Sequence, residues 1–282
     1  MKELILSIEL LIVILLGVAY ITLSERKVMG SMQRRKGPNI VGIYGILQPI
    51  ADGVKLFLKE VIIPSQSNKI NYIVGPIITL ILSLIIWIPI PISNINSAIL
   101  GLPTLGGVAV LYENKYSIIY ILAISSISVY ILLYTGWSSN SKYTFIGAIR
   151  AIAQLVSYEV SMGIIIMSVL VLNNSLNLIE ILYNQIYTSN LLALIPIFIL
   201  FIISALAETN RPPFDLPEAE SELVAGVLTE YSAMAFASLY LAEYSFLQSM
   251  SILTSILFFG NTVFTFLIIF VFIWVRAALP RV

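Results

Sequence analysis

The sequence predicts an all-α integral membrane protein that forms a single polytopic domain over residues 1–282. Of these residues, 59% are hydrophobic and only 11% are charged, and the mean hydropathy is +0.98. These values are typical of a chain made mostly of apolar spans. The first apolar run, residues 4–23, has about the 20 residues that a helix needs to cross a bilayer. It leads directly into the rest of the chain, which is not the pattern of a cleaved signal or transit peptide.

Six further apolar runs follow, so we expect about seven transmembrane helices. The later runs lie near residues 70–90, 116–134, 145–172, 191–206, 223–243 and 257–275. If the N-terminus lies outside, only Lys2 and Lys115 of the fifteen basic residues fall on the outer side, and thirteen fall inside. This asymmetry agrees with the positive-inside rule and gives the predicted orientation.

The residue types that are missing exclude several kinds of chemistry. The chain has no cysteine and no histidine, and fifteen basic residues balance fifteen acidic ones. Iron–sulfur clusters, haem ligation through Cys or His, thiolate zinc sites and catalytic triads are therefore not expected, and we predict no metal site. The balanced charge gives no basic surface for nucleic acid. Any redox chemistry must belong to a bound ligand or to another subunit.

The first inner loop, residues 24–69, is too long for a plain connector. Its apolar residues recur at helical spacing, which predicts an amphipathic helix over about 44–62 that Pro64 terminates. The residues of this apolar stripe are Ile46, Leu47, Ile50, Val54, Phe57 and Val61. A stripe of this kind is more often plain packing against lipid or a neighbouring span than a ligand site.

An acidic loop, AETNRPPFDLPEAESELVAGVLTEY at residues 207–231, separates the predicted fifth and sixth spans. Carboxylates between membrane spans are costly unless water, partners or shared protons reach them. Three prolines indicate a fixed shape, although a solvated loop that keeps one face soluble is the simpler alternative. The loop contains Arg211 and six carboxylates: Glu208, Asp215, Glu218, Glu220, Glu222 and Glu230.

Other carboxylates fall inside apolar runs. Glu159 would cost several kcal/mol in its ionised form without a partner, so it is either a protonated structural group or part of a proton relay. If the sixth span begins near residue 223, Glu222 and Glu230 lie about 12 Å apart along one helix and, with Glu218, could form a ladder of carboxylates. Glu243 is expected on a different face and nearer the outer side, where a surface group and a functional one are equally plausible.

Several of these segments resemble one family. ETNRPPFDLPEAESELVAG followed by EYS resembles the signature of the membrane subunit of respiratory complex I that is called chain 1 or the H subunit. SERK followed by QRRKGPNIVGIYGILQPIADGVKLFLKE resembles the first inner loop of that protein, and SYEVSMG and WVRAALPRV resemble later segments. The resemblance covers residues 2–281. Family members usually have an eighth span, so we expect a separate small subunit or another protein to supply it here.

The resemblance implies a subunit that lines the quinone chamber and links quinone reduction to proton translocation. The chain itself is expected to bind no cofactor, with ubiquinone as substrate and FMN and iron–sulfur clusters in peripheral-arm partners. Its other partners are the remaining complex I membrane subunits and the bilayer, in the mitochondrial inner membrane or a bacterial plasma membrane. The expected residues of the quinone chamber and its entrance are Glu25, Arg26, Arg35, Asp52, Phe57, Arg211, Phe214 and Arg276. The expected proton relay comprises Glu159, Glu208, Asp215, Glu218, Glu220, Glu222 and Glu230.

Two other functions stay open at this point. A stand-alone proton-coupled transporter would also contain intramembrane carboxylates and a proline-interrupted loop, although the two halves show no inverted repeat. The homologous subunit of a membrane-bound hydrogenase-type complex could carry a similar acidic loop without binding quinone.

Overall fold

The computed structural model describes residues 2–91, 104–105, 108–109, 112–185, 188–216, 224–260 and 264–278. Over these residues the regular structure is helical, apart from one antiparallel pair of two-residue strands, β1 (Thr104–Leu105) and β2 (Val108–Ala109). The predicted all-α class is therefore confirmed.

Seven long helices overlap the seven apolar runs of the sequence. They are α1 (Lys2–Met32), α3 (Lys69–Ile85), α5 (Ser117–Ser138), α6 (Lys142–Asn173), α9 (Ile195–Glu208), α11 (Ala233–Thr254) and α12 (Thr265–Ala278). Shorter elements are η1 (Ile43–Gly45), α2 (Gln48–Leu58), α7 (Leu178–Asn184), α8 (Asn190–Ala193), η2 (Gly226–Leu228) and the π-helical η3 (Ser255–Phe259).

Three of these helices are long and apolar enough to cross a membrane: Ser7–Met32 of α1, α5 and α6. Helices α3, α9 and the Thr265–Val275 part of α12 are apolar but shorter. These helices agree with an all-α membrane protein. The number of helices that cross a bilayer stays a prediction.

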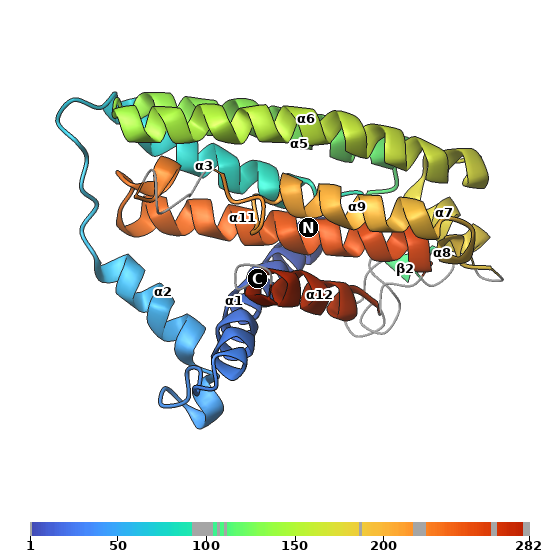
Figure 1. Cartoon of the computed structure of the whole chain (residues 1–282), viewed down its shortest axis with the longest axis horizontal. Helices are drawn as coiled ribbons and strands as arrows, with labels where there is room; N and C mark the ends of the chain where they lie inside the picture. Colours follow the sequence, from blue (N-terminus) through green and yellow to red (C-terminus); the bar gives the residue numbers. More distant parts are fainter. Residues whose placement is uncertain are drawn as a thin grey trace.

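Helix α11 lies at the centre of the helical arrangement (Figure 1). It contacts α3, α1, α9, α2 and α12, while α5 packs on α3 and α6, and α6 packs on α9. In Figure 1, α5 and α6 run side by side along one edge, and α1 and α12 lie on the other side of α11. Segments far apart in the sequence therefore meet around α11.

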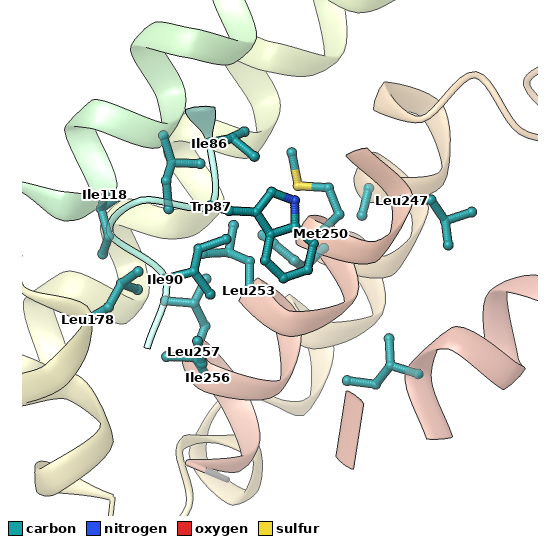
Figure 2. Close-up of a cluster of buried hydrophobic side chains, with 14 of the residues drawn as sticks. Ile86, Trp87, Ile90, Ile118, Leu178, Leu247, Met250, Leu253, Ile256 and Leu257 are labelled. Atoms are coloured by element: carbon teal, nitrogen blue, oxygen red, sulfur yellow. The ribbon is translucent and has the colours of Figure 1, made fainter. Parts of the chain in front are cut away.

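A large apolar cluster closes the bundle where α3 ends and the last turns of α11 lie (Figure 2). Trp87, 3% exposed, packs there with Ile86 and Ile90, close to Leu247 and Met250 of α11. In a lipid environment, such contacts stabilise helix association through van der Waals packing rather than through exclusion of water. The cluster fixes the end of α3 against α11.

The amphipathic helix of the first inner loop is shorter than predicted. It begins at Gln48 because Tyr44 (φ 55°) and Gly45 (φ 77°) adopt left-handed backbone conformations that cannot continue an α-helix. It ends at Leu58, where Lys59 becomes extended, before Pro64 is reached. The following residues lead in an extended path from α2 to α3 (Figure 1).

The predicted start of the sixth span near residue 223 is wrong. Val224 (φ 68°) and Gly226 (φ 49°) have left-handed backbone conformations, and the α-helix starts only at Ala233. The turn around Gly226 packs on α6 so closely that a Cβ on Gly147 would lie 3.1 Å from the Gly226 Cα. Glu230 therefore precedes α11 instead of lying on it, which removes the predicted helical ladder. Glu218, Glu220 and Glu222 lie outside the described residues.

Candidate functional site

A buried arginine forms the centre of the site. Arg211 lies just after α9, where its backbone N–H donates to the Leu206 carbonyl (3.2 Å), and its side chain is 3% exposed. Its Nε lies 3.0 Å from Oε1 of Glu243, and its Nη1 lies 3.6 Å from Oε1 of Glu25. The acidic loop, α1 and α11 thus each contribute one charged group to the same buried position.

Tyr244 completes this cluster. The Arg211 guanidinium carbon lies 4.1 Å from the centre of the Tyr244 ring, and the Tyr244 hydroxyl donates to Glu25 Oε2 at 2.5 Å. Burial by itself lowers the pKa of Arg211, but attraction to Glu243, Tyr244 and Glu25 outweighs it and raises the pKa above its usual range. Arg211 is therefore charged at all relevant pH values. We call Glu25, Arg211, Glu243 and Tyr244 the buried charge cluster.

A cavity of about 400 Å³ lies between α1, α2 and α11, on one side of this cluster. Its wall is mostly apolar, and its polar residues include Arg26 and Asp52, whose side chains form an ion pair at 2.6 Å. Tyr244 belongs both to the cavity wall and to the buried charge cluster. Its lining includes Arg26, Asp52, Gly53, Phe57, Tyr240 and Tyr244. We call this space the apolar cavity.

Two smaller cavities lie on the other side of Glu243. One, of about 110 Å³, is lined by Glu243 together with Thr79, Thr209 and Asn210. The other, of about 20 Å³, is lined by Glu208 and Glu159. Both cavities share the lining residues Ser128, Leu155 and Phe246, so they adjoin each other. The larger one has the volume and the polar groups that internal water requires.

The expected quinone-chamber residues fall into three groups. Arg26, Asp52 and Phe57 line the apolar cavity, and Glu25 and Arg211 lie directly behind it in the buried charge cluster. They are brought together by the packing of α1 and α2 on α11.

The remaining members of that set lie elsewhere. Arg35 is exposed and donates through Nε to Gln33 Oε1. Phe214 does not line the apolar cavity, and its ring meets the Tyr158 ring edge-on with centroids 5.5 Å apart. The side chain of Arg276 lies outside the described residues.

The expected relay residues are only partly brought together. Glu159 and Glu208 line the same small cavity, where Glu208 interacts with the Ser125 hydroxyl. Asp215 lies within electrostatic range of Glu243. Glu230 is placed differently, since its backbone carbonyl accepts a hydrogen bond from the Tyr72 hydroxyl at 2.5 Å. Among the described residues, no group of three or more Asp, Glu, Cys or His is arranged to hold a metal ion.

Two residues of the cluster were not among the expected site residues. The sequence pattern predicts Glu243 on a different face and nearer the outer side, and it does not mark Tyr244 as a site residue. Glu243 instead lies in the middle of α11 and pairs with Arg211. The reasoning that singled out Glu159, a carboxylate within an apolar run, applies equally to Glu243 and would have identified it.

Comparison with known proteins identifies the family. A family model described as NADH dehydrogenase matches residues 5–282. The chain is 49% identical to NADH-ubiquinone oxidoreductase chain 1 of Chondrus crispus, over 97% of this chain and 86% of that protein. It is 46% identical to the H subunit of the NADH-quinone oxidoreductase of Paramagnetospirillum magneticum, over 97% of this chain and 82% of that protein. It is 48% identical to the H subunit of Rickettsia prowazekii, over 97% of this chain and 83% of that protein. The chain therefore belongs to the NADH dehydrogenase family of complex I membrane subunits, whose members are known as chain 1 or the H subunit.

Proposed function

We propose that this chain forms the membrane wall of the quinone chamber in a proton-translocating NADH–ubiquinone oxidoreductase and links quinone reduction to proton translocation. The observation that carries the proposal is the position of Tyr244, which lines the apolar cavity and donates its hydroxyl hydrogen bond to Glu25. A ligand in the cavity would therefore be one side chain away from the Glu25 carboxylate.

The apolar cavity suits a quinone with an isoprenoid tail. Its volume of about 400 Å³ lies in the range of small-molecule sites, and its mostly apolar wall would accept a hydrocarbon chain. The Arg26–Asp52 ion pair adds polar groups to the wall. FMN and iron–sulfur clusters would belong to peripheral-arm partner subunits, and electrons would reach the quinone from there.

The order of the acidic groups supports the proposed proton coupling. Reduction of a quinone to a quinol consumes two electrons and two protons, so the charge beside the cavity changes in each turnover. Glu25, Arg211 and Glu243 lie in contact behind Tyr244, and the two small cavities continue from Glu243 to Glu208 and Glu159. A carboxyl group responds to a new neighbouring charge by gaining or losing a proton, which passes the change along this series.

The relatives favour this function over the alternatives. Those named above are subunits of NADH–ubiquinone or NADH–quinone oxidoreductases, which agrees with the quinone-linked alternative rather than with a stand-alone transporter. They include both a chain 1 protein and its bacterial counterparts. The proposed location is the mitochondrial inner membrane, with a bacterial plasma membrane as the alternative.

The test compares activities of the intact complex in membranes. Glu208→Gln should lower NADH:quinone reductase turnover and proton uptake into vesicles, while NADH oxidation by ferricyanide stays at the wild-type rate. Glu180→Gln is the matched control, because Glu180 is exposed on α7 and lines neither the apolar cavity nor the two small cavities beside Glu243. Normal quinone reduction and proton uptake in Glu208→Gln would contradict the relay. Loss of the ferricyanide activity as well would mean failed assembly.

A further inference from the structure

A side chain of α6 holds the turn that carries Arg211. Gln154 is 5% exposed, and its amide nitrogen donates to the Ala207 carbonyl at 2.7 Å and to the Phe214 carbonyl at 2.8 Å. Ala207 precedes Arg211 and Phe214 follows it. One amide group therefore bridges the two sides of the turn.

The orientation of this amide is fixed by its surroundings. A glutamine amide nitrogen has two N–H donors, and here both have a carbonyl acceptor. The Asn210 Oδ1 atom lies 3.5 Å from the same nitrogen, at the limit of a hydrogen bond. A rotated amide would point Oε1 at carbonyl oxygens and lose both bonds, since an oxygen cannot donate. Gln154 therefore holds the turn in one geometry.

The turn needs such support because it carries Arg211, whose charged side chain is buried. Arg211 must reach Glu243 on α11 and Glu25 on α1, with its guanidinium over the Tyr244 ring. The local backbone hydrogen bonds of the turn include Asn210 N–H to the Ala207 carbonyl, Arg211 N–H to the Leu206 carbonyl and Phe214 N–H to the Arg211 carbonyl. They close the turn on itself but do not attach it to α6, whereas Gln154 does.

We propose that Gln154 is the positioning residue that holds Arg211 between Glu25 and Glu243. It touches neither the apolar cavity nor the two carboxylates, so it acts through Arg211. This inference rests on the proposed function, because it assigns Gln154 a role in quinone-linked turnover.

The first test replaces Gln154 by a side chain of similar length without donors. In Gln154→Met, kcat for NADH:quinone reductase should fall about tenfold, because small displacements of a charged group in a site are costly. KM for quinone should stay unchanged, because Gln154 does not line the apolar cavity. The ferricyanide activity should also stay unchanged.

Gln185→Met is the matched control. Gln185 is equally buried at 6% exposure, and its amide donates to the Ile181 and Ile256 carbonyls, which lie away from Arg211. If Gln185→Met lowers kcat as much as Gln154→Met, the effect is general loss of packing and the proposal is overturned.

A double-mutant cycle separates positioning from simple structural support. Arg211→Lys keeps the charge but not the guanidinium geometry. If Gln154 acts through Arg211, Gln154→Met should lower kcat little further in the Arg211→Lys background, since effects that act through one group do not add. Multiplicative losses would overturn the proposal.

If Gln154→Met does not assemble, Gln154→Asn gives the same test. Its amide keeps the donors but is one methylene shorter, so it can reach only one of the two carbonyls, and a smaller kcat loss with unchanged KM is expected. Wild-type kcat in Gln154→Asn would overturn the proposal. If Gln154→Met has the wild-type turnover while Arg211→Lys and Glu208→Gln are impaired, the positioning role is refuted. If each of the three single variants reduces quinone at the wild-type rate, the proposed function is refuted.

Discussion

Nε of Arg211 lies 3.0 Å from Oε1 of Glu243, although one residue belongs to the loop after α9 and the other to the middle of α11. Arg211 is 3% exposed and Glu243 is 21% exposed, so the guanidinium is buried and the carboxylate is partly accessible. Breaking a buried pair by removing one partner leaves an uncompensated charge, which costs far more than the pair contributes when it is intact. The ion pair therefore favours one position of the end of α9 relative to α11.

Neutralising Glu243 should harm assembly more than neutralising an exposed glutamate. In Glu243→Gln, Arg211 keeps Glu25 as its carboxylate partner at 3.6 Å. The complex should therefore lose stability, but less than the roughly 3–5 kcal/mol that a buried charge with no remaining partner costs. The measurement is the amount of assembled complex on a native gel and its thermal midpoint. Glu180→Gln is the control, and equal behaviour of the two variants would contradict a stabilising ion pair.

Filling the apolar cavity should weaken quinone binding. Gly53 lies on α2 in the cavity wall, and a Cβ there would meet nothing within 4 Å. Gly53→Leu should therefore fold normally, gain up to about 1 kcal/mol of helix propensity, and raise KM for quinone by occupying the cavity. Steady-state kinetics with a short-chain quinone measure this effect.

Gly163→Leu provides the matched control for that experiment. Gly163 is also helical and also has nothing within 4 Å of a built Cβ, but it lies on α6 and does not line the apolar cavity. Its KM should equal the wild-type value. A KM that rises equally in both variants would show that helix substitution, and not the cavity, is responsible.

Tyr231 should make stability fall at alkaline pH. Its hydroxyl donates to the Thr135 carbonyl at 3.0 Å, and burial raises its pKa from 10 to about 12, with a smaller opposing effect from the Ser138 hydroxyl. The unfolded chain ionises near pH 10, so the stabilisation is complete below pH 10 and is lost as the pH rises towards about 12.

Tyr231→Phe removes this titration and keeps the ring that stacks on Tyr72 at 4.4 Å. At pH 8 its free energy of unfolding should be lower than that of the wild type by about 0.5–1.5 kcal/mol, the net contribution of one hydrogen bond, because the Thr135 carbonyl still accepts from the Ser138 hydroxyl at 2.9 Å. A lower thermal midpoint measures this loss. Between pH 9 and 11 the difference should shrink. A constant difference over that range would contradict an ionisable contribution from Tyr231.

Gly147→Ala should disturb the segment before α11. A Cβ on Gly147 would lie 3.1 Å from the Gly226 Cα and from the Val227 backbone nitrogen, and backbone atoms cannot rotate away as a side chain can. We expect less assembled complex and a lower thermal midpoint. The free energy of unfolding should fall by about 1–3 kcal/mol, the usual cost of an overpacked contact. Gly163→Ala, which has open space, should match the wild type. A Gly147→Ala complex as stable as the wild type would mean that the backbone at Gly226 and Val227 can shift to admit the methyl group, which would contradict a tight contact.

The sequence determined those features that depend on composition and on neighbours along the chain. Apolar runs of bilayer length predicted the all-α membrane class and the approximate positions of the seven long helices, because span length follows from bilayer thickness. The sequence motifs also indicate the family that the family model matches. Arg26, Asp52 and Phe57 were assigned to one site through that resemblance, and all three line one cavity.

Features that depend on backbone conformation could not be read from these patterns. The run from residue 223 is apolar enough for a helix, yet left-handed conformations at Val224 and Gly226 and packing on Gly147 delay α11 to Ala233. Periodicity does not report such contacts, because they come from α6. For this reason Glu230 was placed on a helix that it precedes.

Only the tertiary structure decided which charges meet. Arg211 comes from a loop, Glu25 from α1 and Glu243 from α11, and no local spacing connects them. A buried charge pairs with the oppositely charged groups that helix packing brings within a few ångströms of it. The free-energy cost of an unpaired charge in the protein interior is large. The sequence thus determined that this protein carries acids within a membrane domain, and the packing of α1, α9 and α11 decided which of them share one arginine.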